Sequence, residues 1–172
     1  FDNATTFRPG CRLGPRAVRA ASVQLAELSS FPFGFDPFSI LKVIDSGDFL
    51  LNPHNPETII SDIYKQAISI ISSGASLLSI GGDHFVTYPL LKAHAEIYGP
   101  VSLLQFDAHC DTWKSFGELD HGTMFLRAIE EGLIDVESSI QVGIRTHNDF
   151  DVGIKQITSP QIHEIGLSTV IE

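Results

Sequence analysis

The chain has 172 residues, of which 43% are hydrophobic and 19% are charged, and its formal net charge is -10. This composition predicts one globular domain, residues 1–172, with a sizeable core. The acidic balance argues against nucleic acid or an anionic membrane as a partner and tolerates a cationic substrate.

The sequence shows neither a membrane-spanning segment nor a secretory signal. No apolar run approaches the roughly 20 residues that a membrane span needs, and no signal peptide is recognisable. The two cysteines, Cys11 and Cys110, do not make a disulfide framework. We therefore expect a reducing compartment, the cytoplasm.

The first third of the chain predicts a helix, a loop and a strand. Pro15 begins the helix, and residues 16–28 continue it with good helix formers. Residues 29–37 form a loop rich in Ser, Phe, Pro and Gly. The apolar run at residues 41–44 then predicts a short buried strand.

Helices and apolar runs alternate after this point. A cap, an N1 proline and an acid at residues 55–57 begin a helix whose isoleucines recur at helical spacing until Gly74. Residues 77–80 predict a strand, residues 87–98 a helix, and residues 101–106 the next strand. This order predicts a mostly parallel sheet that helices cover.

The C-terminal part continues the alternation. Residues 123–131 predict a helix and residues 140–144 a strand. Ser168 resembles an N-cap before a single helical turn, and a one-turn helix does not stand alone. We therefore expect that the natural chain continues beyond Glu172, so that the domain seen here lacks its C-terminal part.

Polar residues follow two successive predicted strands. Gly81-Gly82-Asp83-His84 ends the first, and Asp107, His109 and Asp111 follow the second at alternating positions. The connecting helix makes the two strands parallel and adjacent, and ligand sites lie at the carboxyl ends of such strands. Alternating side chains share one face, and the two glycines allow a sharp turn and leave room for a cavity.

This cluster has the chemistry of a metal site. Burying four such groups without partners would cost several kcal/mol each, which a divalent ion removes. Two carboxylates and two imidazoles without a thiolate favour Mn²⁺, with Zn²⁺ as the alternative. The Gly-Gly-Asp-His segment taken alone matches equally a turn with a capping aspartate.

Other polar residues near the cluster receive separate interpretations. Cys110 points to the opposite face and is interpreted as a packing residue. His121 opens a helix after Asp111, where either a surface role or an acid/base role fits. Trp113 is interpreted as packing beside the site. The remaining histidines have no such context and are taken as structural or exposed: His54, His94, His147 and His163.

The chain resembles the ureohydrolases, the family of arginase and agmatinase. The resemblance rests on five segments in the family's order: Arg8-Pro-Gly with Gly14-Pro-Arg, Gly81-Gly-Asp-His84, Asp107-Ala-His-Cys-Asp111, His121-Gly-Thr-Met-Phe125 and Val142-Gly-Ile-Arg145. The short stretch between Asp111 and His121 is similar to agmatinase rather than arginase, with guanidinobutyrase and guanidinopropionase as rivals.

The resemblance implies an incomplete three-layer αβα sandwich of the arginase and deacetylase type, a trimeric or hexameric assembly, and two Mn²⁺ ions. It implies that His84 and Asp111 bind one ion, His109 the other, and Asp107 both. Asp111 would also orient the attacking water, and His121 would contact the guanidinium group or carry protons. The implied reaction is the hydrolysis of a small cationic guanidino compound, agmatine, to putrescine and urea.

One part of the family pattern is absent. The remaining ligands come from a Ser-Phe-Asp-x-Asp-x-x-Asp-Pro motif that this sequence lacks, so four of six expected ligands are present. Two alternatives to a ureohydrolase stay open: a non-catalytic homologue or fragment with few metal ligands, and a different metal hydrolase on a similar fold, such as a deacetylase-like amidohydrolase.

Overall fold

The structure is a computed structural model that describes residues 1–25, 28–114, 120–148 and 150–171. Its helices are α1 (Gly14–Ser22), α2 (Ile59–Ser72), α3 (Thr87–Tyr98), α4 (Met124–Glu130), α5 (Ser159–Ile165) and α6 (Leu167–Ile171). Its strands are β1 (Leu104–Phe106), β2 (Ile140–Ile144) and β3 (Lys155–Thr158). Short 3₁₀ turns precede or follow several helices, among them His84–Val86 directly before α3.

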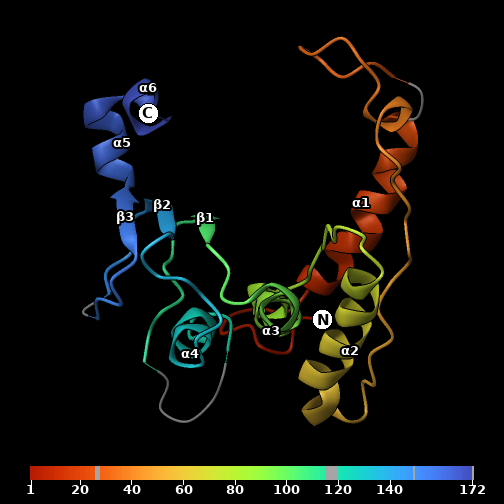
Figure 1. Ribbon diagram of the computed structural model, residues 1–172, viewed down its shortest axis with the longest axis horizontal. Helices are drawn as coiled ribbons and strands as arrows, with labels where there is room; N and C mark the ends of the chain where they lie inside the picture. Colours follow the sequence, from red (N-terminus) through yellow and green to blue (C-terminus); the bar gives the residue numbers. More distant parts are fainter. Residues whose placement is uncertain (26–27, 115–119, 149, 172) are drawn as a thin grey trace.

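The strands form one sheet in the order β1-β2-β3, and both pairings are parallel. Figure 1 shows the sheet with α5 and α6 on one side of the molecule and α1 and α2 on the other, with α3 and α4 between them. The α/β class with a parallel sheet is therefore confirmed. Within the described residues, no helix is long and apolar enough to cross a membrane.

Two apolar clusters hold the helices together. In the first, Phe85 and Tyr88 near the start of α3 pack with Met124 and Phe125 of α4. In the second, Ala67 and Ile71 of α2 join Ala93 of α3. Each cluster joins residues three or four positions apart on a helix, which is the spacing of one helical face.

Three predicted helices are confirmed with small changes at their ends. The helix predicted after residues 55–57 is α2, the one at residues 87–98 is α3, and the one at residues 123–131 is α4. The helix predicted over residues 16–28 is shorter, because α1 ends at Ser22 and a 3₁₀ turn, Val23–Leu25, follows it. Residues 26 and 27 lie outside the described part.

Two predicted strands are wrong. Residues 41–44 and 77–80 are not assigned to any strand, and most of their apolar side chains are exposed, as Ile44 at 86% and Leu78 at 88% show. Leu77 alone among them is partly buried, against the second apolar cluster. An apolar run becomes a strand only where another chain segment pairs with its backbone groups. Among the described residues neither run has such a partner, so the expected pairing of residues 77–80 with the strand before Asp107 is absent.

The remaining strand predictions are confirmed or shortened. Residues 140–144 are β2, whereas the strand expected over residues 101–106 has one bridge at Val101 and a regular part only in β1. The strand β3 and the helix α5 were not predicted. The last helix, α6, begins at Leu167, one residue before the predicted N-cap Ser168, and Glu172 lies outside the described residues.

Candidate metal centre

The loop that leaves β1 carries three of the four predicted ligands. The Asp107 amide donates to the Val142 carbonyl at 3.1 Å, which ties the start of the loop to β2. A register shift in β2 follows at Gly143, whose φ is 92° and where a Cβ would stand 3.3 Å from the Asp107 carbonyl oxygen. Glycine is therefore required at this bulge by both conformation and space.

Three predicted ligands converge. Single ligand atoms of His84, Asp107 and Asp111 all lie within 4.8 Å of one another. His84 Nδ1 is 2.7 Å from Asp111 Oδ2 and 3.5 Å from Asp107 Oδ2. The His84 ring also meets the Phe125 ring edge-on at 5.4 Å, so the imidazole is held between α4 and the loop.

The fourth residue, His109, stands at the edge of this group. Its Nδ1 lies 3.4 Å from Asp107 Oδ1, while its side chain is 52% exposed. The loop bends at residue 108 and is not an extended strand, so alternation alone does not set the side-chain directions. Asp107 therefore stands between two imidazoles and faces each with a different carboxylate oxygen.

Asp111 occupies a special backbone position. Its φ of 51° lies in the left-handed region, and its side chain is buried. Aspartate tolerates this region better than most residues, at a cost of order 1–3 kcal/mol that surrounding contacts must offset. One such contact is the Phe125 amide, which donates to the Asp111 carbonyl at 3.0 Å. Cys110 beside it is fully buried, which confirms its predicted packing role.

The second loop, residues 81–84, is organised by Asp83. Its Oδ1 accepts from the Phe85 amide at 2.9 Å, which caps the turn before α3, and its Oδ2 accepts from the Ala4 amide at 3.0 Å. The interpretation of the Gly-Gly-Asp-His segment as a capped turn is thus correct for Asp83. His84, the next residue, lies beside the carboxylates, as the metal-site interpretation expected.

The glycines of this loop have another purpose than the one expected. Neither Gly81 nor Gly82 has a positive φ. A Cβ on Gly82 would stand 1.5 Å from the Phe1 carbonyl oxygen, and the Asp83 amide donates to that same oxygen at 3.0 Å. Gly82 therefore admits the N-terminal segment and does not leave room for a cavity.

The N-terminal segment also fixes His121. The Thr6 amide donates to His121 Nε2 at 3.1 Å, and Thr6 Oγ1 lies 2.9 Å from the same nitrogen. Because an amide is always a donor, Nε2 is the acceptor, and the neutral ring carries its proton on Nδ1. The Ala4 carbonyl accepts from the His121 amide at 3.3 Å. One segment thus holds both candidate loops.

The carboxylates of the site differ in their electrostatics. Burial acts against ionisation of Asp107, but the His109 amide and the neighbouring His84 imidazole outweigh it, so the pKa of Asp107 lies below its usual value. Burial raises the pKa of Asp83, against the amides of Ala4 and Phe85 that lower it. Asp107 is therefore an anion that a cation can bind, whereas Asp83 is a structural cap.

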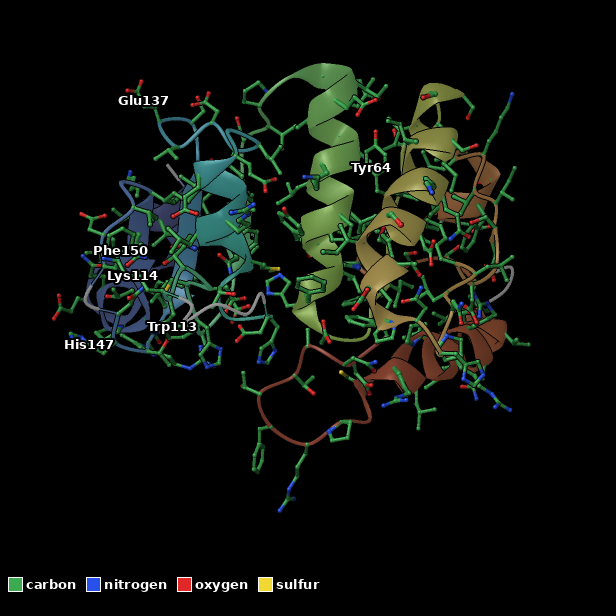
Figure 2. All side chains as sticks on the ribbon, turned by 90° about the horizontal axis from the view of Figure 1, so that it is seen from below. Tyr64, Trp113, Lys114, Glu137, His147 and Phe150 are labelled. Carbon is green, nitrogen blue, oxygen red and sulfur yellow. The ribbon has the colours of Figure 1, made fainter. Side chains whose placement is uncertain are left out.

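An open cavity of about 940 Å³ adjoins the cluster. Its wall includes Phe7 from the N-terminal segment, Asp111, Trp113, Lys114 and His121. Figure 2 shows Trp113, Lys114, His147 and Phe150 gathered at one end of the molecule. Trp113 Nε1 donates to the His147 carbonyl at 3.3 Å, and Lys114 Nζ lies 4.2 Å from the centre of the Phe150 ring.

Trp113 packs beside the site and also lines the cavity. Its ring lies 5.9 Å from the His109 ring, and a Cβ on Gly122 would stand 3.2 Å from it. It forms an apolar wall of the cavity. No sequence signal pointed to the contact of Thr6 with His121 or to that of Asp83 with Ala4, because these contacts join residues 115 and 79 positions apart. The other histidines lie apart from the converging ligand atoms.

Comparison with protein families matches residues 1–172 to the Arginase family. The curated agmatinase of Chromobacterium violaceum is 56% identical over 99% of this chain and 54% of its own length. The agmatinase of Cronobacter sakazakii is 43% identical over 99% of this chain and 56% of its own length. The chain thus spans about half the length of the curated relatives it matches.

Solved structures show the same architecture. A hypothetical agmatinase from Burkholderia thailandensis aligns with a TM-score of 0.94 and 55% identity, over 99% of this chain and 55% of that one. The proclavaminate amidino hydrolase of Streptomyces clavuligerus aligns with a TM-score of 0.86 and 33% identity, over 98% and 59% of the two chains. These likenesses confirm the expected arginase-type fold.

Proposed function

The chain belongs to the arginase family, and from this premise we propose that the complete protein hydrolyses agmatine to putrescine and urea with two Mn²⁺ ions. The observation that supports this most is the convergence of His84, Asp107 and Asp111 within 4.8 Å. The similarity to agmatinases supports the choice of substrate.

The donor set fits a divalent ion. His84 Nδ1 approaches the carboxylates of Asp107 and Asp111 to 3.5 and 2.7 Å, and oxygen and imidazole donors suit Mn²⁺. No thiolate competes, because the Cys110 sulfur is buried and accepts a hydrogen bond from Asn148 Nδ2 at 3.1 Å. When bound, two divalent ions lower the pKa of a shared water and polarise the substrate.

Each residue has a proposed role. His84 and Asp111 would hold one ion, His109 would hold the other, and Asp107 would contribute to both; its two carboxylate oxygens face different imidazoles. Asp111 also orients the attacking water. His121 has Nε2 engaged by Thr6, so it exchanges its proton at Nδ1. Hydrolysis adds one water across the guanidinium C–N bond and releases urea and a protonated amine.

The cavity supports an elongated substrate. Its volume of about 940 Å³ exceeds what a guanidinium group fills, and Trp113 and Phe7 provide apolar surface for a methylene chain. Aromatic faces also attract cations, at about 0.5–2 kcal/mol each. A guanidinium head at the ligand cluster and an aliphatic chain along Trp113 is the arrangement that we propose.

A second candidate substrate is 4-guanidinobutanoate, whose tail is a carboxylate. Lys114 borders the cavity and would attract an anionic tail, whereas Asp120 has one carboxylate oxygen occupied by the Gly122 amide at 2.7 Å. The substitution Lys114→Met separates the two candidates. It leaves agmatine turnover unchanged or faster if agmatine is the substrate, and it raises the KM for 4-guanidinobutanoate if that compound is the substrate.

The direct test measures urea. The complete gene product, loaded with Mn²⁺, is expected to release urea from agmatine far faster than from arginine, and Asp107→Asn is expected to abolish that release. Equal urea release by the wild type and Asp107→Asn would refute the hydrolytic proposal. Faster turnover of 4-guanidinobutanoate than of agmatine would replace the substrate and retain the chemistry.

A further inference from the structure

A row of three glutamines crosses the sheet. Gln105 of β1, Gln141 of β2 and Gln156 of β3 stand at paired positions in the parallel register. Gln141 Nε2 donates to Gln105 Oε1 at 2.6 Å, and Gln156 Nε2 donates to Gln141 Oε1 at 2.7 Å. The amides therefore form one chain of hydrogen bonds in which every donor points from β3 toward β1.

This series of hydrogen bonds ends at the loop of the candidate metal centre, residues 107–111. Gln105 Nε2 donates to the His109 carbonyl at 3.1 Å, and Gln141 Nε2 also donates to the Cys110 carbonyl at 2.7 Å. The Ala108 carbonyl accepts from the Arg145 amide and from Thr146 Oγ1, both at 2.9 Å. Each of the three carbonyls between Asp107 and Asp111 is thus held by a donor from the sheet or from the segment after it.

Burial makes this arrangement specific. Gln141 is fully buried and Gln105 is 5% exposed. A buried amide without partners loses about 1–3 kcal/mol, and both N–H bonds and the oxygen of Gln141 are used. Turning the Gln141 amide over would place its oxygen against Gln105 Oε1 and the Cys110 carbonyl, where only repulsion results. The loop carbonyls consequently have one favourable position.

We propose that Gln141 and Gln105 are positioning residues for the metal-binding loop, acting through the carbonyls of His109 and Cys110. The link to metal binding rests on the function proposed above. Neither glutamine belongs to the converging ligands or to the cavity wall. They restrain the backbone between His109 and Asp111, and Asp111 has a left-handed φ of 51°. Partners that orient metal ligands are worth about 10–100-fold in metal affinity.

The test compares Gln141→Met and Gln105→Met with a matched control in the complete gene product. The control is Gln66→Met in α2, because Gln66 also joins backbone groups, accepting from the Leu50 amide at 2.9 Å and donating to the Leu50 carbonyl at 3.0 Å. Methionine keeps the length of each side chain and removes its hydrogen bonds.

Two measurements are made on each variant. Amide hydrogen exchange of the metal-free protein reports the restraint of residues 107–112 directly, and titration with Mn²⁺ alone gives the dissociation constant. We expect both glutamine variants to exchange faster in this segment and to bind Mn²⁺ about 10–100-fold more weakly. Gln66→Met is expected to change neither value, although it loses comparable hydrogen bonds.

Unchanged exchange at residues 107–112 in both variants would overturn the proposal, as would unchanged Mn²⁺ affinity in a wild type that binds the ion. Gln156→Met covers the case in which the buried substitutions do not fold. Gln156 is exposed, and removing its donor leaves only Gln141 Oε1 without a partner, so a smaller rise in exchange is expected. A wild type without Mn²⁺ affinity would refute the metal proposal, while the exchange data would still decide on the glutamines.

Discussion

The substitution Gly82→Ala tests whether the N-terminal segment organises the site. The new Cβ would stand 1.5 Å from the Phe1 carbonyl oxygen and 2.7 Å from the Phe1 carbonyl carbon. To restore an ordinary contact, the Phe1 carbonyl must retreat by about 2 Å. This movement breaks the 3.0 Å bond that the Asp83 amide donates to Phe1, and it pulls Ala4 away from the Asp83 carboxylate.

The expected cost follows from these contacts. Crowding of this kind costs about 1–3 kcal/mol, and each lost hydrogen bond adds about 0.5–1.5 kcal/mol. For a chain of this size, a total of about 2–6 kcal/mol lowers the Tm by roughly 5–20 °C. Since the same segment holds His121 through Thr6, we also expect a lower kcat of the Mn²⁺-loaded protein.

The matched control is Gly14→Ala. Among the described residues, its Cβ would meet only the Gly81 carbonyl oxygen, at 3.7 Å, and the φ of Gly14 is −56°, which alanine adopts without strain. Thermal unfolding followed by circular dichroism measures both variants. A Tm of Gly82→Ala within about 2 °C of the Gly14→Ala value would refute the close approach of Phe1 and Gly82.

Three further predictions concern single side chains. Asp111→Asn retains the left-handed conformation and is expected to bind Mn²⁺ more than tenfold more weakly. Asp111→Ala should show the same loss of affinity in a Mn²⁺ titration and also lose about 1–2 kcal/mol of stability in thermal unfolding. Equal Tm values for the two variants would contradict the role of the positive φ. Thr6→Val removes the hydroxyl beside His121 Nε2 and should lower kcat about 2–10-fold with unchanged Mn²⁺ affinity. The control Thr6→Ser should retain activity. An identical profile of kcat against pH in the wild type and both variants would contradict a role for this contact. The Arg12 guanidinium lowers the pKa of Asp2 from 3.8 to about 2. A carboxyl group with a lowered pKa stabilises the fold above pH 3.8, and this stabilisation is lost as the pH falls toward 2. The Tm difference between the wild type and Arg12→Met should therefore shrink as the pH falls through that interval, and a constant difference would contradict the ion pair.

Local patterns predicted α2, α3 and α4 well, and three of the four candidate ligands lie close together as expected. The isoleucines of α2 and the caps near α3 act within one or two turns, so their effect is readable from neighbouring residues. The apolar run before Asp107 correctly indicated that Asp107, His109 and Asp111 follow the end of a strand, which is β1. His84 followed from the same reasoning, although the strand before it is absent.

Strand pairing could not be predicted in the same way. The apolar runs at residues 41–44 and 77–80 have the composition of buried strands, but pairing depends on which distant segment lies alongside. At β3 the structure has a strand where none was predicted. Its first residues, Lys155 and Gln156, are polar, so the sequence lacks the apolar run that indicates a strand, yet β3 pairs with β2. The contacts of Gln141 could not be predicted either, because they depend on the register of three paired strands.

We propose that His84, Asp107, His109 and Asp111 are this chain's ligands of a two-ion manganese centre. Anomalous X-ray diffraction from crystals of the complete gene product grown with Mn²⁺, recorded at the manganese absorption edge, tests it most directly. We expect two manganese peaks, one beside His84 and Asp111 and the other beside His109, with Asp107 close to both. Well-ordered side chains at these positions without any manganese peak beside them, at saturating Mn²⁺, would contradict it.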